Sequence, residues 1–431
     1  MTVTTRSLAG DTETYDLIGV GFGPSNLALA IALEEAGSPL RVKFLEARPA
    51  FAWHPGMMIP GADMQISFLK DLVSQRNPQS RYTFINYLHE KGRMNAFINR
   101  KTFFPSRVEF NDYLKWAADQ FDCCDYDRRV IAIEPDTSAG AVQNVEVTSC
   151  DADGREVRYR ARNLVVAPGG RPAFPAVCKG LACTDRILHT HDYMRKLVPQ
   201  LRPNARIAVV GGGQSAAEVF ADLANRPQAP HVDLVMRADA MKPSDDSAFV
   251  NEIFAPEQTD AFHDLPEGAR LSLLKDLAAT NYAVVDEDLI DAIYTMLYEQ
   301  AVTGEARLAL RARTHVTGVS LRDEDVGLEL QTRSGVETAY YDRVIFATGY
   351  TRDLDEHTLH GLMPFCATRT AGRDYRLVMK DGFDPAVFVQ GFSETSHGLS
   401  DTLLSVLAQR SAEIAHSLCH LTDPEQAVAA E

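Results

Sequence analysis

The sequence predicts an α/β fold with two Rossmann-like domains and a small helical lobe, because it contains two glycine-rich loops in matching surroundings. The first loop, GFGPSN, occupies residues 21–26 and follows an apolar run at 15–20. The second loop, GGGQSA, occupies residues 211–216 and follows an apolar run at 206–210. Each run is typical of a buried parallel strand, and the residues after each loop have a helical pattern.

Each loop predicts a binding site for a dinucleotide. The first glycine of such a loop makes a tight turn, and the second lets the backbone approach a pyrophosphate. The N-terminus of the following helix adds free N–H groups and a partial positive charge. Asn26 and Ala216 stand where the motif has its third glycine. The loop residues expected to contact the two cofactors are Gly21, Gly23, Pro24, Ser25 and Asn26, and Gly211, Gly213, Gln214 and Ser215.

The residue after the second strand of each unit distinguishes the two cofactors. The strand at 41–45 is followed by Glu46, about twenty residues beyond the first loop, where an acid suits the ribose hydroxyls of FAD or NAD. The strand at 232–236 is followed by Arg237, and a cation there suits the 2′-phosphate of NADPH. The pair of units therefore predicts FAD and NADPH with their redox ends facing each other.

Composition narrows the class of protein. The 431-residue chain has 43 basic and 59 acidic residues, a net charge of −16, which argues against nucleic acid and anionic membranes as partners. No apolar run approaches the roughly 18 residues of a membrane span, and the N-terminus has no secretory-signal pattern. Seven mostly scattered cysteines favour the reducing cytoplasm. No His, Cys, Asp or Glu cluster has metal-ligand spacing, so no metal site is expected.

The order of strands predicts that the second domain is inserted into the first. Apolar strands ending in glycine turns lie at 164–170 and 344–350, and a helix is expected at 403–418. We expect the strand at 344–350 to return the chain to the FAD domain. The expected organisation is an FAD domain at 15–195 and 343–420, an NADPH domain at 200–342, and loose tails at 1–14 and 423–431.

A helical lobe is expected inside the second domain, at about 244–302. The alternation of strands and helices lapses there, and residues 268–280 and 286–302 have helical periodicity. This segment is a candidate substrate lobe. A helical excursion that packs the interface between domains explains the pattern equally well.

Two cysteines raise an alternative oxidoreductase class. Cys178 and Cys183 have the CxxxxC spacing used by pyridine nucleotide–disulfide reductases. In those enzymes the pair follows the first glycine loop closely, whereas here it lies far downstream in a connector. A second alternative is a redox-sensing or scaffold protein that binds nucleotides without catalysis.

Six sequence blocks carry a more specific signal together, and the second and fourth of them are far more diagnostic than the glycine loops, which many flavoproteins share. They are GVGFGPSN at 19–26, MQISFLKDL at 64–72, FFPSRVEF at 103–110, KPSDDSAFVNE at 242–252, ATGY at 347–350 and HGLSD at 397–401. On these blocks the chain resembles, over about residues 15–418, the flavin-dependent N-hydroxylating monooxygenases of siderophore biosynthesis. These are the L-ornithine N5-monooxygenases and the L-lysine N6-hydroxylases, and the chain is most similar to the ornithine enzymes.

The resemblance implies a reaction. NADPH would reduce FAD, O2 would form a C4a-hydroperoxyflavin, and the side-chain amine of L-ornithine would attack its distal oxygen to give N5-hydroxyornithine. L-Lysine and a free diamine remain alternative substrates. A homo-oligomer, dimer or tetramer, is compatible with the sequence.

The chemistry sets opposite demands on the two ends of a substrate pocket. An alkyl ammonium has a pKa of about 10.4, and only the neutral amine is nucleophilic. The amine end should therefore be desolvated and free of carboxylates. The other end must hold an α-carboxylate, for which the flexible cation Lys70 is suited. A diamine has no carboxylate, so Lys70 argues against that alternative.

The resemblance also implies the remaining site residues. Asn251 and Asn281 would complete the grip on the amino acid with Lys70, and Ser405 would close the site. Gln65 would lie near the flavin ring and help to stabilise the hydroperoxide, so the implied catalytic set is Gln65, Lys70 and Asn281.

Several more residues are implied to contact the cofactors. Trp53 would pack on the flavin, although packing in the core accounts for it equally well. Arg107 and Arg237 would address NADPH, with a surface ion pair as the alternative for Arg107. The other implied cofactor contacts are Thr280, Thr348 and Gly349.

Overall fold

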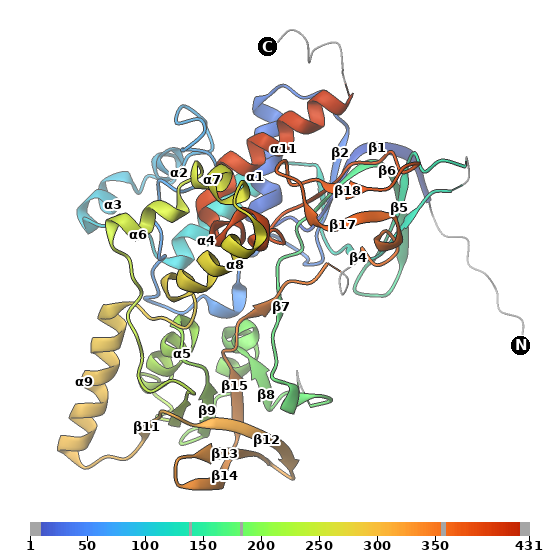
Figure 1. Cartoon of the computed structure of the whole chain (residues 1–431). Helices are drawn as coiled ribbons and strands as arrows, with labels where there is room; N and C mark the ends of the chain where they lie inside the picture. Colours follow the sequence, from blue (N-terminus) through green and yellow to red (C-terminus); the bar gives the residue numbers. More distant parts are fainter. Residues whose placement is uncertain (1–9, 138–139, 182–183, 355–358, 423–431) are drawn as a thin grey trace, which may run out of the picture.

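The chain folds into two α/β units joined by two extended segments, as Figure 1 shows. The computed structural model describes residues 10–137, 140–181, 184–354 and 359–422. Within these residues no helix is both long enough and apolar enough to cross a membrane.

The first unit is built on a seven-stranded sheet. Its order is β3-β2-β1-β6-β5-β4, with β19 also paired to β6. Strands β1, β2, β3, β6 and β19 pair in parallel, whereas β4 and β5 are antiparallel additions. The strands are β1 (Gly10–Val20), β2 (Val42–Leu45), β3 (Cys124–Asp125), β4 (Arg129–Pro135), β5 (Val145–Cys150), β6 (Glu156–Val166) and β19 (Val387–Val389).

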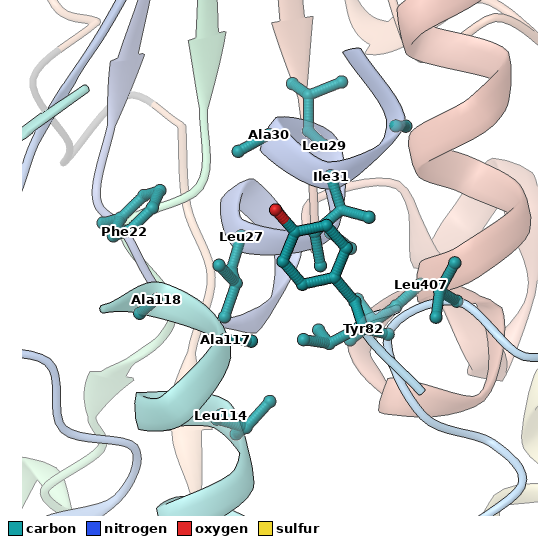
Figure 2. Close-up of a cluster of buried hydrophobic side chains, with 14 of the residues drawn as sticks. Phe22, Leu27, Leu29, Ala30, Ile31, Tyr82, Leu114, Ala117, Ala118 and Leu407 are labelled. Carbon is teal, nitrogen blue, oxygen red and sulfur yellow. The ribbon is translucent and has the colours of Figure 1, made fainter. Parts of the chain in front are cut away.

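Helix α1 is the centre of the first core. All its residues from Asn26 to Leu33 are buried, so a helix apolar on every side is covered on every side. Figure 2 shows its side chains between those of α4 and Leu407 of α11. The helices of this unit are α1 (Pro24–Glu35), α2 (Phe84–Glu90), α3 (Met94–Arg100), α4 (Arg107–Ala118), α10 (Glu394–His397) and α11 (Leu407–Thr422).

The second unit is built on a five-stranded parallel sheet in the order β11-β10-β9-β15-β8. Helix α5 follows β9 directly, as a Rossmann unit requires, and α9 packs beside α5. The elements are β8 (Ile187–His189), β9 (Arg206–Val210), α5 (Gln214–Ala224), β10 (His231–Val235), α9 (Glu287–Thr303), β11 (Leu308–Arg311) and β15 (Arg343–Phe346).

Three small sheets complete the fold. An antiparallel sheet lies between β11 and β15 in sequence, and the pair β7–β16 forms a ribbon between the two units. These strands are β7 (Arg171–Pro172), β12 (His315–Arg322), β13 (Asp325–Thr332), β14 (Gly335–Tyr341), β16 (Tyr350–Thr351), β17 (Cys366–Ala371) and β18 (Leu377–Met379).

The strand pairing corrects three expected boundaries. Residues 343–346 were expected to begin the return to the first domain, but β15 pairs with β8 and β9 in the second sheet. Strand β8, which was expected in the first domain, also belongs to the second sheet. An apolar strand before a glycine turn fits either sheet, so the pattern alone does not assign it. The expected tail at 1–14 is wrong for 10–14, which form part of β1; 1–9 and 423–431 lie outside the described residues.

The helical lobe at 244–302 is confirmed as helical, and its helices divide between the two units. Helices α7 and α8 contact α10 of the first unit, while α9 packs against α5 of the second; Figure 1 shows the same division. The remaining helices of the lobe are α6 (Ala248–Asn251), α7 (Gln258–His263) and α8 (Glu267–Asp276). The lobe therefore bridges the two units.

A close backbone approach at Gly56 predicts a strong steric effect. A Cβ on Gly56 would lie 1.8 Å from the carbonyl oxygen of His191. We expect Gly56→Ala to lower the free energy of unfolding by about 3 kcal/mol or more, because backbone must move to admit the methyl group. Chemical denaturation measures this.

The control for Gly56 is Gly268→Ala in helix α8, where a Cβ would meet nothing within 4 Å. This variant should be more stable than the parent by about 0.5–1 kcal/mol, because alanine favours a helix. Equal stability of the Gly56 variant and the parent would contradict the steric explanation.

Candidate active site

The first glycine loop leaves the N-terminus of α1 open. Gly21 has a φ of +83°, and a Cβ there would lie 2.7 Å from the carbonyl oxygen of Ala167. A Cβ on Gly23 would meet nothing within 4 Å. No side chain caps the helix, its first turn has no acid, and Pro24 stands at its start. Free N–H groups facing open space fit a pyrophosphate.

Two side chains of the first loop bind to the protein itself. Asn26 Nδ2 donates to the carbonyl oxygens of Val20 at 3.2 Å and Gly21 at 2.7 Å, and Asn26 Oδ1 accepts from Gln390 at 2.9 Å. The fully buried Asn26 side chain thus shapes the loop. Ser25 Oγ accepts a 3.0 Å hydrogen bond from the buried guanidinium of Arg410.

Glu46, the residue expected at a ribose, lies directly after β2. It is buried, and its two carboxylate oxygens accept from the N–H groups of Phe22 at 2.9 Å and Arg48 at 3.0 Å. Each oxygen has a second acceptor site, so the carboxylate can hold the loop and still accept from a ribose hydroxyl.

The second loop is built in the same way but is partly covered. A Cβ on Gly211 would lie 2.5 Å from the carbonyl oxygen of Ala347, and α5 begins at Gln214 without a capping side chain or an acid in its first turn. Ser215 is half-buried in that first turn. A Cβ on Gly213 would stand 3.4 Å from Cα of Ala283, so the segment before α9 crosses the loop. Arg237 is exposed beyond β10, the strand that follows helix α5.

Arg107 forms an ion pair between the two units. Its guanidinium donates to both carboxylate oxygens of Glu218, each at 2.8 Å, and to the carbonyl oxygen of Met57 at 3.1 Å. The Arg107 and Glu218 side chains are only 12% and 6% exposed. The pair is therefore internal, in contrast to the surface pair considered from the sequence.

Gln65 also reaches across the junction. Its Nε2 donates to Asp286 Oδ1 at 2.9 Å, and Gln214 Nε2 donates to Asp286 Oδ2 at 2.8 Å. Gln214 Nε2 lies 3.1 Å from Glu218 Oε1 as well. One chain of hydrogen bonds thus connects the MQISFLKDL segment, the second glycine loop and Arg107.

Lys70 and Asn251 line one pocket, of about 300 Å³, with Gln75, Ala255, Pro256, Glu257 and Gln409. Burial lowers the pKa of Lys70 below its ordinary value, because a half-buried ammonium has lost part of its hydration. Among the described residues no carboxylate forms an ion pair with Lys70. The negative charge of a bound carboxylate would compensate the ammonium for the hydration that burial removes.

Asp71 holds the turn that presents Lys70. Its buried carboxylate accepts from the N–H groups of Val73, Ser74 and Phe84 and from the Ser74 hydroxyl, at 2.6–2.9 Å. Burial raises the pKa of Asp71, and these hydrogen bonds oppose the rise. These hydrogen bonds thus fix the conformation of the segment that carries Lys70.

Asn281, Thr280 and Ser405 do not line the Lys70 pocket. Asn281 is half-buried just after a short 3₁₀ turn, and the Thr280 hydroxyl donates to the carbonyl oxygen of Leu277 at 2.7 Å. Ser405 is buried, and its Oγ has no hydrogen-bond partner among the residues that the structure describes. The structure therefore brings Asn251 to Lys70 but does not bring Asn281 or Ser405 to that pocket.

Three further residues that were expected to contact a cofactor have structural roles within the protein. The Trp53 ring packs edge-on against Phe110 at 6.0 Å between centroids, as part of the first core. The Thr348 hydroxyl donates to the carbonyl oxygen of Ala173, and Gly349 has a φ of +78°. Thr348 and Gly349 lie next to the β7–β16 ribbon, at the crossing between units.

The cysteine alternative receives no support from the described residues. Cys178 is buried as a free thiol, and burial raises its pKa to about 11, which disfavours a reactive thiolate. Cys183 lies outside the described residues. No group of three or more His, Cys, Asp or Glu residues in the described part of the chain could hold a metal.

Sequence reasoning did not identify Glu218, Asp286 or Arg410 as parts of the site. Glu218 carries one signal, a carboxylate on the buried face of a helix that begins at a glycine loop. Asp286 directly precedes a helix, a position that is typical of an ordinary N-cap residue. The contacts of all three join residues far apart in sequence.

Comparison with known proteins places this site in context. The chain matches the family model described as L-lysine 6-monooxygenase/L-ornithine 5-monooxygenase over residues 13–352. It is 48% identical over 402 residues to an L-ornithine N(5)-monooxygenase of Burkholderia cepacia, covering 89% of this chain and 90% of that protein.

Solved structures agree over nearly the whole chain. An ornithine hydroxylase from Pseudomonas aeruginosa has a TM-score of 0.92 and 46% identity, covering 95% of this chain and 100% of that one. An ornithine N-hydroxylase of Kutzneria sp. 744, solved with reduced FAD, NADP⁺ and L-ornithine, has a TM-score of 0.89 and 36% identity, with the same coverage of 95% and 100%.

The Arg107–Glu218 pair predicts a large loss of stability on truncation. Arg107→Ala leaves the Glu218 carboxylate buried without its cation, so we expect the free energy of unfolding to fall by about 3–5 kcal/mol. Denaturation without added nucleotide measures this, and removing both side chains should cost less than the sum of the single changes.

Arg202→Ala is the matched control, since Arg202 is 56% exposed in its ion pair with Asp342. A loss within about 1 kcal/mol is expected there. Comparable losses for the two arginines would mean that the internal pair contributes no more than a surface pair.

Proposed function

Because the chain belongs to the L-lysine 6-monooxygenase/L-ornithine 5-monooxygenase family, we propose that it uses NADPH and O2 to hydroxylate the side-chain amine of L-ornithine. The product would be N5-hydroxyornithine, for a siderophore or a related metabolite with an N–O bond. The observation that carries the proposal is the pocket in which Lys70 and Asn251 meet.

The residues present fit both cofactors. FAD would lie along the first loop with Glu46 at its ribose, and NADPH along the second with Arg237 at its 2′-phosphate. Both helices begin without a capping side chain or an acid in the first turn, which leaves their N–H groups for a pyrophosphate. When bound, the two cofactors supply the electrons and activate the oxygen, chemistry that the side chains themselves do not provide.

The side chains then bind and orient the substrate. Lys70 holds the α-carboxylate as a cation whose hydration is already reduced by burial, and Asn251 adds an amide to the lining of the same pocket. By resemblance, Gln65 would act beside the flavin, and Arg107 would address NADPH from its ion pair with Glu218. Asn281 and Ser405 do not line the Lys70 pocket, so the contacts that the resemblance implies for them would lie outside it. The amine must arrive neutral, so its end of the site must exclude water and carboxylates.

Two further properties belong to this proposal. The seven cysteines are an odd number and are mostly scattered along the chain, which supports a reducing compartment such as the cytoplasm. Homo-oligomerisation, as a dimer or a tetramer, is proposed on the resemblance alone.

Product analysis tests the function directly. Purified protein with FAD, NADPH and O2 is incubated separately with L-ornithine, L-lysine and putrescine, and hydroxylamine is assayed. We expect product from L-ornithine. Product from L-lysine or putrescine instead would assign the chain to the corresponding alternative, and NADPH oxidation that yields only hydrogen peroxide with all three would contradict the substrate assignment.

Lys70→Ala should weaken ornithine binding selectively. Losing a charge-assisted contact of about 1.5–3 kcal/mol should raise the KM for L-ornithine about 10- to 100-fold, while the rate of flavin reduction by NADPH stays near that of the parent. Steady-state and stopped-flow kinetics measure the two effects. Lys275→Ala, at an exposed position in α8, is the control and should leave the KM unchanged, and an unchanged KM in Lys70→Ala would refute the carboxylate contact.

The dependence of kcat/KM on pH should have two limbs. Between about pH 7 and 9 it should rise as more of the substrate amine loses its proton. Burial lowers the pKa of Lys70, so the lysine loses its charge at a pH below the ordinary lysine pKa of about 10.4. The KM for L-ornithine should rise as that charge is lost. Lys70→Arg should remove this alkaline limb, because arginine stays charged. An alkaline limb that persists in this variant would assign it to another group.

A further inference from the structure

Asp286 lies between two glutamines that come from different units. Its Oδ1 accepts from Gln65 at 2.9 Å, and its Oδ2 accepts from Gln214 at 2.8 Å. Gln65 comes from the MQISFLKDL segment of the first unit, and Gln214 is the first residue of helix α5 in the second. The single carboxylate therefore contacts both sides of the junction.

An ionised carboxylate determines which way an amide points, because it accepts hydrogen bonds and donates none. Gln65 must present its NH2 group to Asp286, and its Oε1 is consequently directed away from that carboxylate. The exposed Gln65 side chain has no other hydrogen bond among those described. The orientation of this amide thus depends on Asp286 alone.

Gln214 is held differently. Its Oε1 accepts from the backbone N–H of Asp286 at 2.9 Å, and its Nε2 donates to Glu218 at 3.1 Å as well as to Asp286. Three contacts agree on one orientation, so Gln214 would not turn if one of them changed. Of the two amides on Asp286, only Gln65 is free to flip.

We propose that Asp286 is a positioning residue that fixes the side-chain amide of Gln65, so that Gln65 presents a hydrogen-bond acceptor to the flavin side of the junction. Asp286 acts through Gln65 and touches neither substrate nor cofactor. This inference rests on the proposed function, in which Gln65 stands beside the flavin and controls how much of the NADPH consumed yields hydroxylated product.

Asp286→Asn tests the inference with almost no change in size. The new oxygen would accept from Gln214, whose orientation is fixed, and the new NH2 group would face Gln65. Gln65 would then turn its Oε1 toward residue 286 and present a donor to the flavin side. We expect hydroxylated product per NADPH to fall at least about fivefold, the scale of one reversed hydrogen bond, with hydrogen peroxide rising to match.

Binding measurements separate orientation from opening of the junction. The dissociation constants for FAD and for NADP⁺, measured by calorimetry, should stay within about twofold of the parent, since the contacts of Gln214 persist. Asp288→Asn, an exposed position two residues along in helix α9, is the control and should change neither coupling nor affinity. In a Gln65→Ala background, Asp286→Asn should have no further effect on coupling.

Three results would overturn the inference. Unchanged coupling in Asp286→Asn would show that the amide orientation is set elsewhere. Weakened NADP⁺ binding would show that Asp286 serves Gln214 instead. A coupling loss that persists without Gln65 would show that Asp286 acts by another route. Failure of the parent protein to hydroxylate L-ornithine, L-lysine or putrescine would instead remove the proposed function.

Discussion

The internal contact between Arg107 and Glu218 is the interaction on which the geometry of the whole site depends. Two dinucleotide domains are useful together only if the ends of their cofactors meet, and small rotations at the junction move those ends apart. An arginine that donates to both oxygens of a carboxylate restricts rotation as well as distance. Arg107 is the first residue of α4, and Glu218 lies on α5, which begins at the second glycine loop. The pair therefore orients the two units at the junction between the two loops.

The hydrogen bonds from this pair to Gln65 make the junction polar and directional. An apolar interface of the same area would hold the units together, but it would tolerate sliding, because hydrophobic burial has no preferred direction. Hydrogen bonds at 2.8–3.1 Å are lost when a unit shifts by a fraction of that length. The chain thus has charged and amide groups at the junction, where the relative position of the two units matters most.

The sequence predicted what local patterns encode. The two glycine loops, their flanking strands and helices and the helical nature of 244–302 all follow from short segments and were found as expected, whereas the role of Glu46 at a ribose stays a prediction. The membership of strands was not predictable, because β15 and β6 have the same apolar pattern before a glycine turn and differ only in which neighbours they meet. Local patterns could not predict the pocket of Lys70 and Asn251, because the two residues lie far apart in the chain. Only the resemblance implied it.

The return of the chain to the first unit has a consequence for how the protein is made. Asn26, which shapes the first loop, is bonded to Gln390, 364 residues later, and the apolar helix α1 packs against α11 at the C-terminal end. During synthesis, which proceeds from the N-terminus, α1 emerges long before the helix that covers it. The second unit, complete by β15, can close first. The first unit must wait with an apolar face uncovered until α11 has left the ribosome.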